Sequence, residues 1–352
     1  MELAPGPVEM RADVLSVGGS QPRYFRTDQF SEWMLALKAK FLRVLGLDSH
    51  HEIIFLTGSG TAGMEAVAAN LLPRRDHLAI SSGQFGDRMW EISRRRHFRF
   101  SRVRMDTTKS PEDNLCTLDL DKYKSCFSTI AETSNGYFID PRAIRRAGLP
   151  DSSLLMCDGI SAAFSDAFDA SATDALIIGS QKGLGLFPGM CFIVLSEKAI
   201  DASLSNRTDV NLYYDFHLYI DNMKRGQTPF TPSLTVLYQL DRVLDNIEAD
   251  GGLAAVTAAR EALAMRFRAR LDGHGIQYTR EYASNCVTVL HTGSVDAELI
   301  AQDLKDNYDI TVATNSPPLK KTHFRISHMG NNTLDEMDRA AEAIWFAMRE
   351  RS

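Results

Sequence analysis

Two charged residues, Asp158 and Lys182, each follow an apolar run of strand length in the middle of the chain. The runs cover residues 153–157 and 175–179. A strand that is buried on both faces has a continuous apolar sequence, so both runs suit the interior of a parallel sheet covered by helices. We therefore expect Asp158 and Lys182 just beyond the carboxyl ends of two strands, at the edge where open α/β sheets bind ligands.

The sequence around Lys182 favours a buried amine over a solvated one. Glycines precede and follow it, at Gly179 and Gly183, and glycine allows another group to approach the backbone closely. A desolvated amine has a lowered pKa and can condense with a carbonyl, while a nearby carboxylate can keep a ring nitrogen protonated. Pyridoxal phosphate needs both groups. On this stretch alone, a structural ion pair at the sheet edge is an equally open interpretation.

A glycine-rich turn, Gly58 to Thr61, joins a predicted strand at 51–57 to a helix that runs to about residue 72. Free amides at a helix N-terminus suit a phosphate. The same glycines match the GxGxxG pattern of dinucleotide sites, which requires an acidic residue at the end of the next strand. That strand, 77–80, ends instead in Ser-Ser-Gly. The sequence therefore favours a single phosphate, with a turn that binds no ligand as the alternative.

Two further segments lie where predicted strands end, at the edge of the sheet expected to hold Asp158 and Lys182. In the first, Phe85 stands between two glycines and could lie flat on a ligand ring, although packing in the core is the commoner role of a phenylalanine. The second is the polar cluster 132–136, in which a strand predicted at 126–132 ends. The nearby run 94–96, three arginines, is interpreted as the solvated end of a helix because the chain as a whole is acidic.

Composition indicates an ordinary soluble globular protein of 352 residues, with 44% hydrophobic and 24% charged residues. The net charge of -6 gives no electrostatic reason to expect a nucleic acid or an anionic membrane as a partner. There is no secretory leader and no long apolar run, so a cytoplasmic location is expected. The five cysteines never occur as CxxC, which argues against a disulfide framework and a zinc site.

Strands and helices alternate through the first two thirds of the chain, which predicts a doubly wound α/β domain with a mixed, mostly parallel sheet. A long helix is predicted from Glu248 to Leu271. With the pattern of short strand, helix, strand and helix that follows, it predicts a small α+β domain beyond about residue 249. We therefore expect an N-terminal arm at 1–15, a large domain at 16–248 and a small domain at 249–352.

Taken in order, these motifs resemble the class V aminotransferases of fold type I, the group of the alanine:glyoxylate, serine:glyoxylate and 2-aminoethylphosphonate:pyruvate transaminases. The resemblance implies a pyridoxal 5'-phosphate enzyme in which Lys182 forms the Schiff base and Asp158 holds the pyridine nitrogen. It also implies a set of residues around the cofactor: Ser59, Gly60, Thr61 and Gln181 at the phosphate, Phe85 on the ring, Thr133 near the ring hydroxyl, and Ser161.

The resemblance extends to two segments of the last third of the chain. Thr228 and Thr231 stand where the family reaches the cofactor phosphate of a neighbouring subunit, which implies a homodimer with shared sites. Arg325, within the segment 324–330, resembles the arginine that binds the substrate carboxylate.

The implied reaction is a ping-pong transfer of an amino group from an amino acid or related small amine to a 2-oxo acid such as pyruvate or glyoxylate. Two alternatives stay open. A lyase of the same fold, similar to cysteine desulfurases, needs a nucleophilic cysteine on a mobile loop near the site. A nicotinamide-dependent dehydrogenase is less well supported, and lacks visible absorbance as purified.

Overall fold

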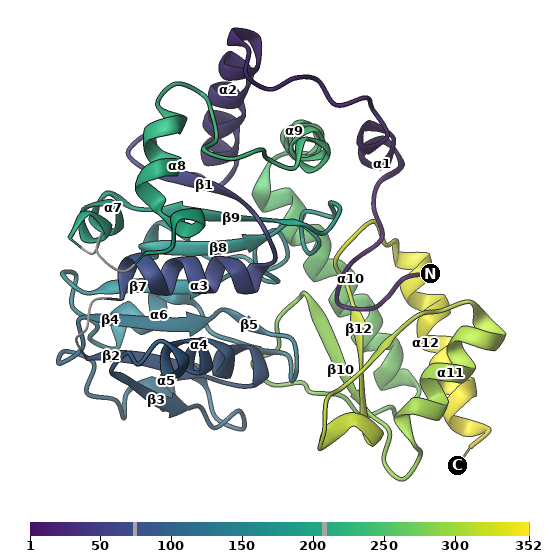
Figure 1. The fold of residues 1–352 in the computed structure, drawn as a ribbon. Helices are drawn as coiled ribbons and strands as arrows, with labels where there is room; N and C mark the ends of the chain where they lie inside the picture. The colour runs from purple at the N-terminus through teal and green to yellow at the C-terminus, as the bar shows by residue number, and fades with distance from the viewer. Residues whose placement is uncertain (73–75, 206–209, 352) are drawn as a thin grey trace.

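A computed structural model describes residues 1–72, 76–205 and 210–351 of the chain (Figure 1). Its centre is a seven-stranded sheet with the order β1-β9-β8-β7-β4-β2-β3. Strand β9 runs antiparallel to both of its neighbours, β1 and β8, and the other pairs are parallel. The prediction of a mixed, mostly parallel sheet is confirmed.

The strands of this sheet are β1 (Glu52–Thr57), β2 (His77–Ser81), β3 (Phe100–Arg104), β4 (Ser125–Thr129), β7 (Leu154–Asp158), β8 (Ala175–Gly179) and β9 (Met190–Leu195). A small hairpin consists of β5 (Ala131–Glu132) and β6 (Tyr137–Phe138). A separate three-stranded sheet, in the order β10-β12-β11, consists of β10 (Val287–His291), β11 (Ala313–Thr314) and β12 (His323–Ser327).

The helices up to residue 249 are α1 (Ala12–Gly18), α2 (Asp28–Val44), α3 (Gly60–Leu71), α4 (Gln84–Arg95), α5 (Pro111–Leu115), α6 (Pro141–Arg146), α7 (Glu197–Leu204), α8 (Phe216–Met223) and α9 (Leu234–Ala249). They are followed by α10 (Leu253–Gly273), α11 (Ala297–Tyr308) and α12 (Leu334–Arg349). Short 3-10 turns are η1 (Ala170–Ala172), η3 (Leu212–Tyr214) and η4 (Leu319–Lys321).

Helices cover both faces of the large sheet. Apolar side chains of α3, α4, α7 and α8 pack against one face, and those of α2, α5, α6 and α9 pack against the other. Strands β7 and β8 are buried along their whole length, as the continuous apolar runs predicted. A layered arrangement of this kind leaves the ends of the strands as the accessible edge of the sheet.

Helices α10, α11 and α12 pack with the small sheet around a core of their own. The first residues of the chain lie against this unit: Leu3 is fully buried in its core, and the amide of Leu3 donates to the carbonyl of Thr311. Figure 1 shows the chain leaving this unit and rising toward α1. The N-terminal segment thus connects the small sheet to the large one.

Three local predictions differ from the structure, and one strand was not predicted. Strand β3 has no buried residue at the edge of the sheet and a charged sequence, so it lacks the apolar run by which its neighbours were predicted. The strand predicted at 126–132 is interrupted at Ile130. Helix α1 begins inside the predicted arm, and the helix predicted from Glu248 starts only at Leu253 because Gly251 and Gly252 take positive φ angles, +103° and +85°. The proposed division into domains stays a prediction.

Candidate active site

The two central strands bring the predicted catalytic pair to the same edge. Strands β7 and β8 are parallel neighbours, with Asp158 opposite Ile177, and Lys182 follows β8 by three residues. The amide of Gly159 donates to the carbonyl of Ile177 at 3.0 Å, which holds the two strand ends together. The charge of each group shifts the pKa of the other toward its charged form.

Asp158 lies in a site that disfavours its charge. Its side chain is 5% exposed, and burial raises the pKa of the carboxyl group from 3.8 to about 6. A hydrogen bond from the amide of Ile160, at 2.9 Å, and the charges of Arg88 and Lys182 oppose this effect, whereas Glu132 adds to it. At neutral pH and above the group is ionised, a buried carboxylate near the end of its strand.

Lys182 is shifted in the opposite direction. The pKa of its amine is lowered from 10.5 to about 8, chiefly by burial and also by the charges of Arg325 and Arg88, whereas Cys286 and Asp158 oppose the shift. The amine donates a hydrogen bond to the carbonyl of Pro5 in the N-terminal segment. A neutral fraction of this amine is therefore present near pH 8, as a nucleophile or a base requires.

The residues predicted to hold a phosphate surround the start of α3. Ser59 is the exposed N-cap residue, and Gly60 is packed so closely on Ile160 that a Cβ atom would overlap with it. Thr61, in the first turn, accepts a hydrogen bond at 3.1 Å from the guanidinium of Arg88. Gln181 lies just beyond the end of β8, and its buried Oε1 atom has no partner among the described residues.

The aromatic residue is fixed by a buried acid. The amides of Phe85 and Gly86 donate to one carboxylate oxygen of Glu132, at 2.9 and 3.0 Å, and Ser134 donates to the other. Burial raises the pKa of Glu132. The guanidinium of Arg88 lies over the Phe85 ring, 4.9 Å from its centroid.

Thr133 and Ser161 are both buried, 2% and 8% exposed. Thr133 directly follows Glu132 at the end of the β5 strand, and Ser161 lies in the turn after Asp158. Both therefore lie on segments that end at the Asp158 edge of the sheet.

Arg325 lies on β12 in the small sheet and is half-buried. One terminal nitrogen donates to the carbonyl of Thr314 at 3.1 Å, whereas its Nε atom is buried without a partner in the described part of the chain. Its charge lowers the pKa of Lys182, and burial lowers the pKa of Arg325 itself, a shift that the charge of Glu132 opposes. The charge of Arg325, on the small sheet, thus interacts with those of Lys182 and Glu132 at the edge of the large sheet.

Thr228 and Thr231 are placed differently from each other. Thr228 is buried and its hydroxyl donates to the carbonyl of Phe230 at 2.7 Å, whereas Thr231 is exposed. Phe230 stacks on Tyr213 at 5.0 Å, and the Tyr213 hydroxyl donates to the carbonyl of Thr57. The segment therefore lies beside the strand that leads into the Gly58–Thr61 turn.

Several unpartnered atoms test whether this site fits pyridoxal phosphate. Thr129, opposite Asp158 in the pairing of β4 with β7, has a buried hydroxyl without a partner among the described residues. The same holds for Gln181 Oε1 and Arg325 Nε. Buried polar atoms without partners are costly, so a ligand that supplies acceptors and donors is expected there. A buried amine, a buried carboxylate and a helix N-terminus are the groups that an aldehyde, a pyridine nitrogen and a phosphate require. The residues present fit the cofactor.

The sequence over residues 20–339 matches the class V aminotransferase family, and the chain belongs to that family. The soluble hydrogenase small subunit of Synechococcus sp. (strain PCC 6716) is 30% identical over 94% of this chain and 88% of its own length. The L-aspartate–glyoxylate aminotransferase of Paracoccus denitrificans is 28% identical over 80% of this chain and 74% of its own.

The fold is also shared with solved structures. An aspartate aminotransferase of subgroup IV from Thermus thermophilus superimposes with a TM-score of 0.89 over 100% of this chain and 99% of its own, at 24% identity. The fold is thus that of the fold type I enzymes. Family, fold and buried Lys–Asp pair together define a pyridoxal-phosphate-dependent aminotransferase.

Sequence reasoning missed four contributors to the site. Arg88 and Glu132 belong to the polar segments already singled out, so their positions in those segments were an available signal. Thr129 and Pro5 gave no signal, since a strand threonine and a carbonyl carry no pattern.

In the described residues no cluster of His, Cys, Asp or Glu could hold a metal ion, and no helix is long and apolar enough to cross a membrane.

Proposed function

We propose that the protein transfers the amino group of a small amino acid or related amine to a 2-oxo acid such as pyruvate or glyoxylate, in a ping-pong reaction. The observation that carries the proposal is the pair of buried groups with opposite pKa shifts, Asp158 to about 6 and Lys182 to about 8, on adjacent strand ends. Near pH 8 the acid is ionised and the amine is partly neutral. Both are then in the form in which amino transfer uses them.

Bound pyridoxal phosphate supplies an aldehyde that condenses with amines and a protonated ring that draws electrons from the neighbouring carbon. Asp158 would hold the proton on the ring nitrogen, and the Ser59–Thr61 turn with Gln181 would bind the phosphate. Phe85, fixed by Glu132, would cover the ring, with Thr133 and Ser161 beside it.

Lys182 would move the proton between the substrate carbon and the cofactor, because its Nζ atom is the basic group at this position and is shielded from water. Arg325 would bind the substrate carboxylate through two parallel hydrogen bonds, for which its unpartnered Nε is available. A carboxylate bound in this way would orient the reacting carbon toward Lys182.

We further propose that the enzyme is a cytoplasmic homodimer in which Thr228 and Thr231 approach the cofactor phosphate of the second copy. Support comes from exposed apolar residues near this segment: Leu212 is 69% exposed and Tyr213 is 40% exposed. All five cysteines are free, which agrees with a reducing compartment.

The lyase alternative is less well supported. Of the five cysteines only Cys116 is exposed, and burial raises the pKa of Cys126, Cys157, Cys191 and Cys286. Cys286 is close enough to Lys182 to affect its pKa, yet its own thiol stays protonated and is a poor nucleophile.

The test uses the purified enzyme loaded with pyridoxal phosphate. Amino donors are screened against pyruvate, glyoxylate and 2-oxoglutarate, and Lys182→Ala is compared with the wild type for amino transfer and for a cofactor bond that borohydride fixes. We expect the variant to lose both, while still binding some cofactor through the phosphate turn. Borohydride fixation that survives in the variant would show that another lysine holds the cofactor and would refute this assignment.

A further inference from the structure

Arg88 reaches from the start of α4 to the turn proposed to hold the cofactor phosphate. Its Nη1 atom donates to the hydroxyl of Thr61 at 3.1 Å, and its guanidinium lies 4.9 Å from the centroid of the Phe85 ring. Thr61 is the second residue of α3, where backbone amides have no partner within the helix. One hydrogen bond therefore holds a positive charge directly against the turn.

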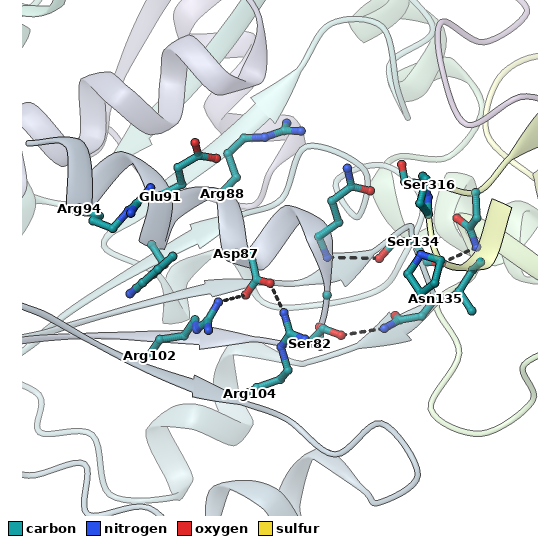
Figure 2. A pocket seen from close by; sticks show the side chains of 17 residues that line it. Ser82, Asp87, Arg88, Glu91, Arg94, Arg102, Arg104, Ser134, Asn135 and Ser316 are labelled. Atoms are coloured by element: carbon teal, nitrogen blue, oxygen red, sulfur yellow. Dashed lines mark hydrogen bonds and ion pairs between the residues drawn. The ribbon is translucent and has the colours of Figure 1, made fainter.

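No acid neutralises Arg88 among the described residues. The two acids nearest to it along α4 are engaged elsewhere: Asp87 pairs with both arginines of β3, and Glu91 pairs with Arg95 at 2.6 Å. Figure 2 shows the half-buried side chain of Arg88 directed away from Asp87. Its one hydrogen bond in the described part of the chain goes to a neutral hydroxyl.

A bound phosphate brings more negative charge than the helix end alone can offset. A phosphate ester carries a charge of about -1.5 to -2 at neutral pH. The amides at a helix N-terminus supply about half an elementary charge. In the described ranges, Arg88 is the one charged residue whose side chain forms a hydrogen bond with residues 58–61.

The hydrogen bond from Arg88 also leaves the proton of the Thr61 hydroxyl available. A hydroxyl has one proton to donate and two lone pairs, whereas a guanidinium can only donate. Arg88 therefore takes a lone pair of Thr61 and leaves its proton for another acceptor. No other partner of this hydroxyl lies within the described segments of the chain. A phosphate oxygen at the turn would be such an acceptor.

We propose that Arg88 is the counterion of the cofactor phosphate, and that it orients the Thr61 hydroxyl to donate to a phosphate oxygen. The phosphate is then bound in its doubly charged form. The inference rests on the proposed placement of the phosphate at residues 59–61. It also implies that the site discriminates strongly against pyridines that lack a phosphate.

The first test compares pyridoxine 5'-phosphate with pyridoxine in calorimetric titrations of the cofactor-free protein. Neither ligand has an aldehyde, so neither can bond to Lys182, and any change in the pKa of that amine affects both alike. Arg88→Gln should weaken binding of the phosphorylated ligand about tenfold or more, because a charged interaction is lost. Binding of pyridoxine should stay unchanged. Equal weakening of both ligands, or of neither, would overturn the proposal.

Arg95→Gln is the matched control. It makes the same change of charge on the same helix, at an exposed arginine that pairs with Glu91. It should bind both ligands as the wild type does, and a loss as large as that of Arg88→Gln would show a general charge effect. Arg88→Lys keeps the charge and should recover part of the affinity. A loss as large as in Arg88→Gln would contradict the role as counterion.

Phosphorus NMR of the cofactor-loaded enzyme measures the charge of the phosphate itself. In the wild type the chemical shift should stay constant from pH 6 to pH 8, although a free phosphate ester titrates with a pKa of about 6. In Arg88→Gln it should move toward the singly charged form as pH falls to 6. A wild-type phosphate that titrates like a free ester would refute the proposal even if the variant does not fold.

Thr61→Val separates failure of this inference from failure of the proposed site. If the phosphate lies at the turn, the variant should weaken pyridoxine 5'-phosphate severalfold and leave pyridoxine unchanged, because a hydrogen bond to a charged group is lost. Such a loss together with wild-type affinity in Arg88→Gln would overturn the role of Arg88 alone. No loss in either variant would overturn the placement of the phosphate as well.

Discussion

Replacing Asp158 by asparagine should make the stability of the cofactor-free protein depend differently on pH. The pKa of the carboxyl group is raised from 3.8 to about 6 in the folded state, because burial disfavours its charge. Below pH 4 the group is protonated in both states and contributes nothing. As pH rises to 6 the unfolded state loses the proton first, so folding becomes less favourable, and the full cost is present above pH 6.

The size of the effect follows from the two pKa values. At ~1.36 kcal/mol for each pH unit, the cost at pH 8 is about 3 kcal/mol, and about half of it develops between pH 5 and pH 8. The asparagine keeps an oxygen that can accept from the Ile160 amide, and any cost of burying its amide is constant with pH. We therefore expect the variant to gain roughly 1.5 kcal/mol relative to the wild type on going from pH 5 to pH 8.

The assay is urea unfolding of both cofactor-free proteins at several pH values, analysed as the difference in unfolding free energy. Asp166, whose pKa is also raised to about 6 by burial, is present in both proteins and largely cancels. The same variant should lose amino transfer by several orders of magnitude, because the proposed partner of the ring nitrogen is gone. A stability difference that does not change with pH would refute the buried, charged state of Asp158 on which the proposed role depends.

Two other substitutions test the surroundings of Lys182. Arg325→Lys should raise KM for amino and keto acids about tenfold, because lysine cannot form the two parallel hydrogen bonds to a carboxylate. An amine donor that lacks a carboxylate, and the absorbance of the cofactor, should be little affected. Equal effects on both kinds of donor would remove Arg325 from the site. Gly6→Ala should reduce activity, because Gly6 has a φ of +117° and a Cβ atom would lie 2.8 Å from Cδ and 2.9 Å from Nζ of Lys182. Gly46→Ala, at a φ of +71° with nothing within 4 Å, is its control for backbone strain, and equal losses of activity in the two variants would contradict a specific contact.

The sequence predicted those parts of the site that are carried by local patterns. The runs before Asp158 and Lys182 are apolar because β7 and β8 are covered on both faces, so the sequence records both the strands and their ends. The turn at Gly58–Thr61 was predicted in the same way, since a glycine-rich segment between a strand and a helix presents free amides that suit a phosphate.

Other parts could not be predicted because they depend on contacts between distant segments. The contact of Pro5 with Lys182 joins residues 177 positions apart and uses a backbone carbonyl, which every residue possesses. Strand β3 is half exposed at the sheet edge, and its pairing with β2, not its own sequence, defines it. Arg94, in the run interpreted as a solvated helix end, lines a cleft together with the segment 315–319, which lies more than 200 residues away and has no local pattern that links it to the run.

The same features that disfavour the empty site explain why it should bind its cofactor tightly. Asp158 and Lys182 are held where burial opposes the charge of each, and the buried atoms of Thr129, Gln181 and Arg325 lack partners in the described chain. Each of these costs free energy in the folded protein and would cost less once a ligand supplies the missing charge or hydrogen bond. A ligand that binds only the folded state stabilises that state by an amount that grows with the logarithm of its concentration over Kd. Bound cofactor should therefore raise the free energy of unfolding of the protein. In the cofactor-free wild type, the carboxyl group of Asp158 should lower stability as pH rises. This loss should shrink when pyridoxal phosphate is added, since the carboxylate then has a partner.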